Sequence, residues 1–159
     1  MREDTLEIRS ATPDDEPLVR EFLEGLSRDS RWNRYHAAVP RIRSWMVHSV
    51  VGADHVRHEA LLAVSDGRVV GVAEWGRLAQ DDGTADIAVV VSDDCRRHGI
   101  ARKLMRRLAR RARSQGIETF TGTILSMNRA TLALVKNVAP VRTFQFDGGT
   151  IEVRVPLSA

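Results

Sequence analysis

The sequence predicts a mixed α/β domain spanning residues 1–159, with a mostly antiparallel central sheet of six to seven strands flanked by about four helices. Three observations predict this class. Two apolar runs around Asp66-Gly67 indicate a hairpin, the apolar run at 84–91 indicates a central strand, and the amphipathic pattern at 99–115 indicates a helix directly after it. A chain of 159 residues is long enough to bury one hydrophobic core.

The first half of the chain predicts a strand, two helices and three antiparallel strands. Thr12 and Pro13 supply an N-cap and a first helical residue, and the acids that follow complement a helix N-terminus. The elements expected here are an alternating strand at 5–9, helices at 13–26 and 40–51, and strands at 60–65, 68–75 and 84–91. Residues 27–40 are assigned to no element.

The second half predicts a helix, a strand, a second helix and a closing hairpin. Leu104 and Leu108 lie on the apolar face of the first helix, whose other face is rich in arginine, and Gly116 ends it. The elements expected here are a helix at 99–115, a strand at 119–125, a helix at 129–138, and hairpin strands at 141–146 and 150–155.

Composition excludes several classes of protein. No stretch reaches the roughly 18 apolar residues of a membrane span, and no signal-peptide core follows the N-terminus. A single cysteine, Cys95, excludes an intramolecular disulfide framework, and the five histidines lack the spacing of metal ligands. We therefore expect a cytoplasmic protein with no metal ion and no membrane partner.

Positive charge gathers in one segment, although the net charge of the chain is only +3. Between positions 96 and 113 there is no acid, and the basic residues are Arg96, Arg97, Arg102, Lys103, Arg106, Arg107, Arg110, Arg111 and Arg113. Such a segment favours binding of a polyanion, and the candidates are a phosphorylated cofactor, a nucleic acid and an acidic protein. The alternative for the more distant arginines is a solvated helix face.

The start of this segment, Arg96-Arg97-His98-Gly99-Ile100-Ala101, is the motif that carries chemistry. It connects a buried strand to the first turn of a helix, where backbone N–H groups lack intrahelical partners and can bind phosphate oxygens. Gly99 allows a close approach of the backbone to the ligand, and Ala101 keeps the first turn narrow. The motif predicts a pyrophosphate site.

Arg96-x-x-Gly99-x-Ala101 resembles the acyl-CoA motif of the GNAT superfamily of N-acetyltransferases, and the order of elements resembles that fold over nearly the whole chain. Three further stretches are similar to the GNAT domains of bacterial protein-lysine acetyltransferases. They are Leu26 to Tyr35, Ala85 to Val91 and Leu125 to Thr131. The resemblance implies that the chain binds acetyl-CoA and transfers its acetyl group to an amine, either a protein lysine or a small molecule.

The resemblance also implies which residues hold acetyl-CoA. Val89 and Val91 match the strand positions whose backbone pairs with the pantetheine arm. The pyrophosphate would lie on the N–H groups of the loop that holds Arg96, Arg97, His98, Gly99, Ile100, Ala101 and Arg102. Asn128 matches a cofactor-contacting asparagine, and its alternative role is to cap the helix that begins at Arg129.

Two carboxylates are candidates for the base that deprotonates the amine. Asp86 matches a glutamate of the lysine-acetylating subgroup and is one methylene shorter, and Glu74 lies on the preceding strand. Either acid has the alternative role of holding an arginine. Many family members also carry a tyrosine seven residues after the asparagine, which protonates the departing thiolate, but here that position is Val135.

Several alternatives stay open at this point. Without that tyrosine, the domain is alternatively a sensor or scaffold that binds acetyl-CoA with little turnover. The arginine-rich helix lacks the interleaved aromatics of a stacking platform, so we do not expect nucleic acid as a partner. Trp32, Tyr35 and Trp45 are candidates for an acceptor groove, with core packing as the alternative, and for Trp45 we favour core packing. The resemblance also allows a homodimer, since C-terminal strands of this fold often pair between subunits.

Overall fold

A computed structural model describes residues 5–138 and 143–157, and it confirms the predicted fold class. The elements are β1 (Glu7–Ser10), the 3-10 helix η2 (Pro13–Asp15), α1 (Glu16–Glu24), α2 (Arg28–Tyr35), α3 (Ser44–Val51), β2 (His58–Ser65), β3 (Arg68–Leu78), β4 (Asp81–Val91), the 3-10 helix η3 (Asp93–Cys95), α4 (Ile100–Ser114), β5 (Thr119–Leu125), α5 (Arg129–Val138), β6 (Thr143–Asp147) and β7 (Thr150–Pro156).

Helix α2 is the main departure from the expected order of elements. It occupies part of the stretch 27–40 that was assigned to no element, and it brings the α-helices to five among the described residues. Its sequence RDSRWNRY carries no apolar stripe, so hydrophobic periodicity gave no signal. The helix begins at an N-cap, Ser27, whose hydroxyl oxygen accepts a hydrogen bond from the Ser30 N–H at 3.1 Å. Helix α3 also begins later than expected, at Ser44.

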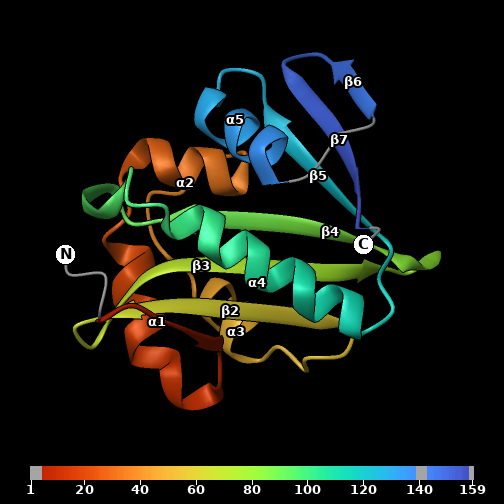
Figure 1. Ribbon diagram of the computed structural model, residues 1–159. Coiled ribbons are helices and arrows are strands. Elements are labelled where there is room, and N and C mark those ends of the chain that lie inside the picture. Colours follow the sequence, from red (N-terminus) through yellow and green to blue (C-terminus); the bar gives the residue numbers. More distant parts are fainter. Residues whose placement is uncertain (1–4, 139–142, 158–159) are drawn as a thin grey trace.

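The seven strands form one sheet in the order β1-β2-β3-β4-β5-β7-β6 (Figure 1). All neighbours are antiparallel except β4 and β5, which run parallel. These two strands pair only at one end, where Thr84 to Asp86 lie opposite Thr119 to Thr121. Beyond Asp86 they diverge, and Figure 1 shows β5 and β7 running away from β4. The sheet therefore opens at its centre.

Alternating residues of the strands divide the core between the two faces of the sheet. In β2, Leu61 and Ala63 pack into the cluster that contains α4, whereas Ala60 and Leu62 pack into the cluster that contains α1 and α3. Helix α4 packs closely on β3, since a Cβ added at Gly71 would lie 2.9 Å from the Leu104 side chain. This close packing positions the first turn of α4 beside the end of β4.

Candidate active site

A cleft of about 1140 Å³ lies where β4 separates from β5. Four walls enclose it, namely the free edge of β4, the start of α4, helix α2 and helix α5. Of the twelve residues predicted from the sequence as cofactor-binding or catalytic, eleven line this cleft; they are Glu74, Asp86, Val89, Val91, Arg96, Arg97, Gly99, Ile100, Ala101, Arg102 and Asn128. His98 is exposed and is not among the lining residues. One cavity thus brings together the predicted loop and both candidate bases.

The loop before α4 has the backbone conformation of an anion site. Gly99 is the N-cap of the helix and adopts a left-handed conformation with φ 73°, and Arg97 does so with φ 67°. Because a glycine N-cap has no side chain, the first N–H groups of α4 receive no side-chain hydrogen bond. In a helix of 15 residues, these groups and the positive end of the macrodipole face an incoming anion. The local structure therefore fits a pyrophosphate.

Replacing Gly99 by alanine tests this loop. Nothing lies within 4 Å of an added Cβ, so the cost comes from the left-handed backbone, about 1 to 2 kcal/mol for a residue other than glycine. We expect Gly99→Ala to lower the affinity for acetyl-CoA about tenfold, measured by calorimetry. Gly76→Ala is the control, because that position also has open space but no positive φ. Equal affinities of the two variants would contradict a role for the loop conformation.

Arg96 is held by neighbouring side chains rather than pointing freely into solvent. Its Nη2 donates to the Ser30 hydroxyl oxygen at 2.6 Å and pairs with Asp93 Oδ1 at 3.3 Å. The loop is therefore tied to the N-terminal half of α2.

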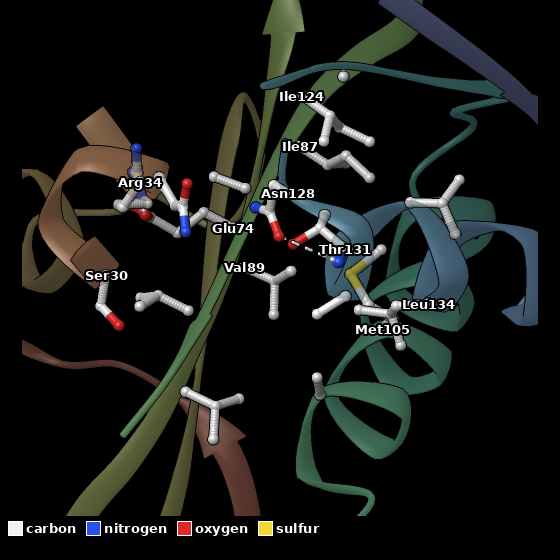
Figure 2. A pocket seen from close by; sticks show the side chains of 18 of the residues that line it. Ser30, Arg34, Glu74, Ile87, Val89, Met105, Ile124, Asn128, Thr131 and Leu134 are labelled. Atoms are coloured by element: carbon white, nitrogen blue, oxygen red, sulfur yellow. Dashed lines mark hydrogen bonds and ion pairs between the residues drawn. The ribbon is translucent and has the colours of Figure 1, made fainter. Parts of the chain in front are cut away.

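The free edge of β4 forms the floor of the cleft. On the α4 side of the sheet, Ile87, Val89 and Val91 are partly buried against the core. Figure 2 shows Val89 near the centre of the cavity, with Met105 and Leu134 beyond it on the helices. Because β4 has no partner strand on this side beyond Asp86, its backbone there is available to an extended ligand. This is where the pantetheine arm was predicted.

Asn128 has the capping role that was its alternative interpretation. Its side-chain Oδ1 accepts a hydrogen bond from the Thr131 N–H at 3.2 Å at the start of α5, as drawn in Figure 2. The same side chain lines the cleft, so capping also fixes its position there. Val135, at the position of the missing tyrosine, lines the cleft and is buried.

Glu74 is neutralised by partners on both of its carboxylate oxygens. Arg34 Nη2 donates to Oε2 at 2.8 Å, and the His58 ring nitrogen Nε2 lies 3.1 Å from Oε1. The side chain is buried. Burial raises the pKa of Glu74, but the interactions with His58 and Arg34 together outweigh it, so the pKa lies below its usual value. A carboxylate held in this way is a weak proton acceptor.

Asp86 has the opposite electrostatic setting. It lies at the point where β4 leaves β5, and its Oδ1 accepts a long hydrogen bond of 3.4 Å from Thr121 Oγ1. The Asp86 side chain is exposed on the wall of the cleft, and the partial desolvation there raises the pKa of its carboxyl, although Thr121 and the charge of Arg34 oppose that effect. The carboxylate faces the same side of the sheet as Glu74, because Glu74 pairs with Ala88, two residues further along β4.

The sequence carries no sign of a role for Arg34, whereas Tyr35 and Trp45 were each candidates for lining an acceptor groove or packing in the core. Arg34 reaches Glu74 from α2, and its guanidinium carbon lies 4.9 Å from the Tyr35 ring centroid. Tyr35 and Trp45 meet edge to face, with centroids 6.4 Å apart, and both line the cleft. Trp45 is 62% exposed, so a core role for it is wrong. Trp32 is exposed and is not among the residues that line the cleft.

Cys95 lines the cleft as a thiol and not as a thiolate. Burial raises the pKa of the Cys95 thiol, and the neighbouring charge of Asp94 raises it further. The protonated form is a poor nucleophile. Among residues 5–138 and 143–157, no group of three or more His, Cys, Asp or Glu side chains is placed to hold a metal ion.

The chain belongs to the acetyltransferase (GNAT) family, whose sequence profile matches residues 19–138. Members of this family use acetyl-CoA. No helix in the described part of the chain is both long and apolar enough to cross a membrane.

Solved structures share the fold over almost the whole chain. The GNAT domain of S. lividans PAT is 24% identical, with a TM-score of 0.89, and the match covers 95% of this chain and 90% of that one. The Salmonella typhimurium protein yncA, solved with its cofactor acetyl-CoA, is 20% identical with a TM-score of 0.74, covering 97% and 95%. Ribosomal-protein-alanine N-acetyltransferase from Brucella melitensis is 20% identical with a TM-score of 0.74, covering 94% and 99%.

Proposed function

We propose that this chain is an N-acetyltransferase that moves the acetyl group of acetyl-CoA to a primary amine, on a protein lysine or a small molecule, with Asp86 as the base. The observation that carries the proposal is the position of Asp86. It lies in the same cleft as the α4 loop, at the point where β4 loses its partner strand. The pantetheine arm, running from the loop along β4, would end beside it.

Acetyl-CoA supplies an activated thioester, and the protein supplies its binding and a proton acceptor. The N–H groups of the first turn of α4, together with Arg97 and Arg102, would hold the pyrophosphate. The unpaired edge of β4 at Val89 and Val91 would hold the arm by its backbone. These contacts fit the residues present, since the loop is cationic, its residues line the cleft, and the adjoining wall is apolar.

Asp86 would take the proton of the attacking amine. A base must be ionised near its working pH and must gain a proton as the new bond forms. The raised pKa of Asp86 meets the second demand better than the lowered pKa of Glu74. Glu74 instead anchors Arg34 and so holds α2 against the sheet. We therefore assign the base to Asp86 and a positioning role to Glu74.

The acceptor would enter from the α2 side of the sheet. Tyr35 and Trp45 form an aromatic wall there, next to the carboxylates of Glu74 and Asp86. An aliphatic stem that ends in an ammonium group suits such a wall, because the stem packs on the rings and the charge faces a carboxylate. Both a lysine side chain and a small alkylamine have this form.

The test is turnover with acetyl-CoA and a panel of amines. We expect free CoA thiol to appear only when an amine is present, together with a product 42 Da heavier by mass spectrometry, about the mass that replacing one amine hydrogen with an acetyl group adds. The panel should include lysine-containing peptides and small alkylamines. Binding of acetyl-CoA without any acetylated product would instead support the sensor, which the buried Val135 at the tyrosine position favours.

A further inference from the structure

Asp93 joins the loop before α4 to the beginning of α2. Its Oδ2 accepts a hydrogen bond from the Ser27 N–H at 3.0 Å, and its Oδ1 accepts from the hydroxyls of Ser27 at 2.9 Å and Ser30 at 2.8 Å. These partners lie 66 and 63 residues earlier in the chain. One carboxylate thus receives three hydrogen bonds from the N-terminus of a helix that belongs to a different wall of the cleft.

Arg96 completes this group of side chains. Its Nη2 donates to the Ser30 oxygen at 2.6 Å and lies 3.3 Å from Asp93 Oδ1. Ser30 is only 2% exposed, so its hydroxyl is positioned by these two partners rather than by solvent. We call the group of Ser27, Ser30, Asp93 and Arg96 the Asp93 clamp. It contacts the anion loop through Arg96 and helix α2 through the two serines.

Helix α2 depends on such contacts for its position. It has 8 residues, fewer than the roughly 12 to 15 that an isolated helix needs to be stable in water. The clamp holds its first turn, and the ion pair from Arg34 to Glu74 holds its last. Near its C-terminal anchor the helix presents Asn33, Arg34 and Tyr35 to the cleft. The geometry of the acceptor side therefore depends on the anion loop.

We infer that the Asp93 clamp couples binding of the acyl-CoA pyrophosphate to the placement of α2, so that acyl-CoA favours binding of the acceptor. The inference rests on the proposed function for the identity of both ligands. A polyanion at the first turn of α4 attracts Arg96 and restricts the loop that holds Asp93, and this restricts the helix that Asp93 holds. By linkage the effect is mutual, because each ligand raises the affinity for the other by the same factor.

Asp93→Asn and Asp94→Asn form a matched pair for the test. Each removes one negative charge from the same loop, but Asp94 accepts a hydrogen bond from Ser92 within its own loop, whereas Asp93 bonds to α2. We expect both variants to bind acetyl-CoA alike in the absence of acceptor. Only Asp93→Asn should raise the KM for the amine, by about fivefold or more, with a smaller change in kcat. Equal KM values for the two variants would overturn the coupling.

Hydrogen exchange gives a readout that does not depend on turnover. In the wild-type protein and in Asp94→Asn, saturating acetyl-CoA should slow amide exchange over residues 28–35, the segment of α2. In Asp93→Asn it should slow exchange at the start of α4 but leave α2 unchanged. Slowing of α2 in all three proteins would refute the clamp. If α2 responds as expected and no amine is acetylated, the proposed function fails and the coupling stands.

Discussion

Asp86→Asn is expected to lower kcat/KM for the amine by about 10²- to 10⁴-fold, the usual contribution of a general base. The amide of asparagine has nearly the shape of the carboxylate but accepts no proton at neutral pH. Binding of acetyl-CoA should change little, since Asp86 lies beyond the part of β4 assigned to the arm. Steady-state kinetics with free-thiol detection, together with calorimetry for the cofactor, measure both quantities.

The pH profile sharpens this prediction. Desolvation raises the pKa of Asp86, so the rate should rise with pH through an inflection above the ordinary range of an aspartate, about 3.9. Asp86→Asn should lose this limb, and Asp86→Glu should keep it.

Stability separates this loss of rate from unfolding. A pKa that is raised in the folded state means that the folded protein holds the Asp86 proton more tightly than the unfolded chain does. Ionisation of this group therefore lowers stability as pH rises through its folded pKa. The neutral asparagine should be at least as stable as the wild type at pH 7. A melting temperature that falls together with the rate would mean that Asp86 is structural.

Glu74→Gln is the comparison for the choice of base. It breaks the charged contact with Arg34 at 2.8 Å and should loosen α2, which raises the KM for the amine more than it lowers kcat. Should Glu74→Gln instead abolish kcat with intact stability while Asp86→Asn keeps it, Glu74 is the base.

Arg111→Ala is expected to destabilise the fold by about 3 kcal/mol, because it leaves a buried carboxylate short of a partner. Glu59 in β2 is 0% exposed, and Arg111 in α4 donates to its Oε2 from Nε at 3.2 Å and from Nη2 at 3.1 Å. The other oxygen lies 2.7 Å from His55 Nδ1 and accepts the Ala60 N–H at 2.9 Å. Removing Arg111 leaves Oε2 buried without its two donors.

Chemical and thermal denaturation measure this cost. For a chain of 159 residues, a loss of this size lowers the melting temperature by roughly 6 to 12 °C. Arg110→Ala is the matched control, since it removes an exposed arginine from the same turn of the same helix and should cost less than about 0.5 kcal/mol. In the double variant Glu59→Met/Arg111→Ala, part of the stability should return, because no charge remains buried there. Equal losses for Arg110→Ala and Arg111→Ala would contradict this role of Glu59.

Sequence patterns predicted most elements because those elements bury a regular face. The apolar runs at residues 60–65 and 68–75 and the apolar stripe of residues 99–115 indicate which segments pack in the core, and the structure places β2, β3 and α4 there. The predicted helix at 129–138 matches α5. In the closing hairpin, residues 141 and 142 of the predicted strand lie outside the described residues.

Sequence patterns failed at the positions where the local pattern does not match the burial seen in the structure. Helix α2 has no apolar stripe, so it exists through its N-cap and through Asp93, which lies 66 residues away from Ser27. Trp45 resembles a core residue by type, yet it lines an open cleft. His98 belongs to the predicted loop by sequence, but it is exposed and does not line the cleft.

By itself, the sequence predicted the location of the anion loop, because an apolar strand, a short loop with a glycine and an arginine-rich helix follow one another in the chain. Only the tertiary structure distinguished the electrostatic surroundings of Asp86 from those of Glu74. The protonation of a carboxylate depends on its desolvation and on charges within a few ångströms, and for Glu74 these come from Arg34 and His58, which lie 40 and 16 residues away in the chain. Hydrophobic periodicity within one element carries no information about such contacts, because the two residues of each contact lie on different elements.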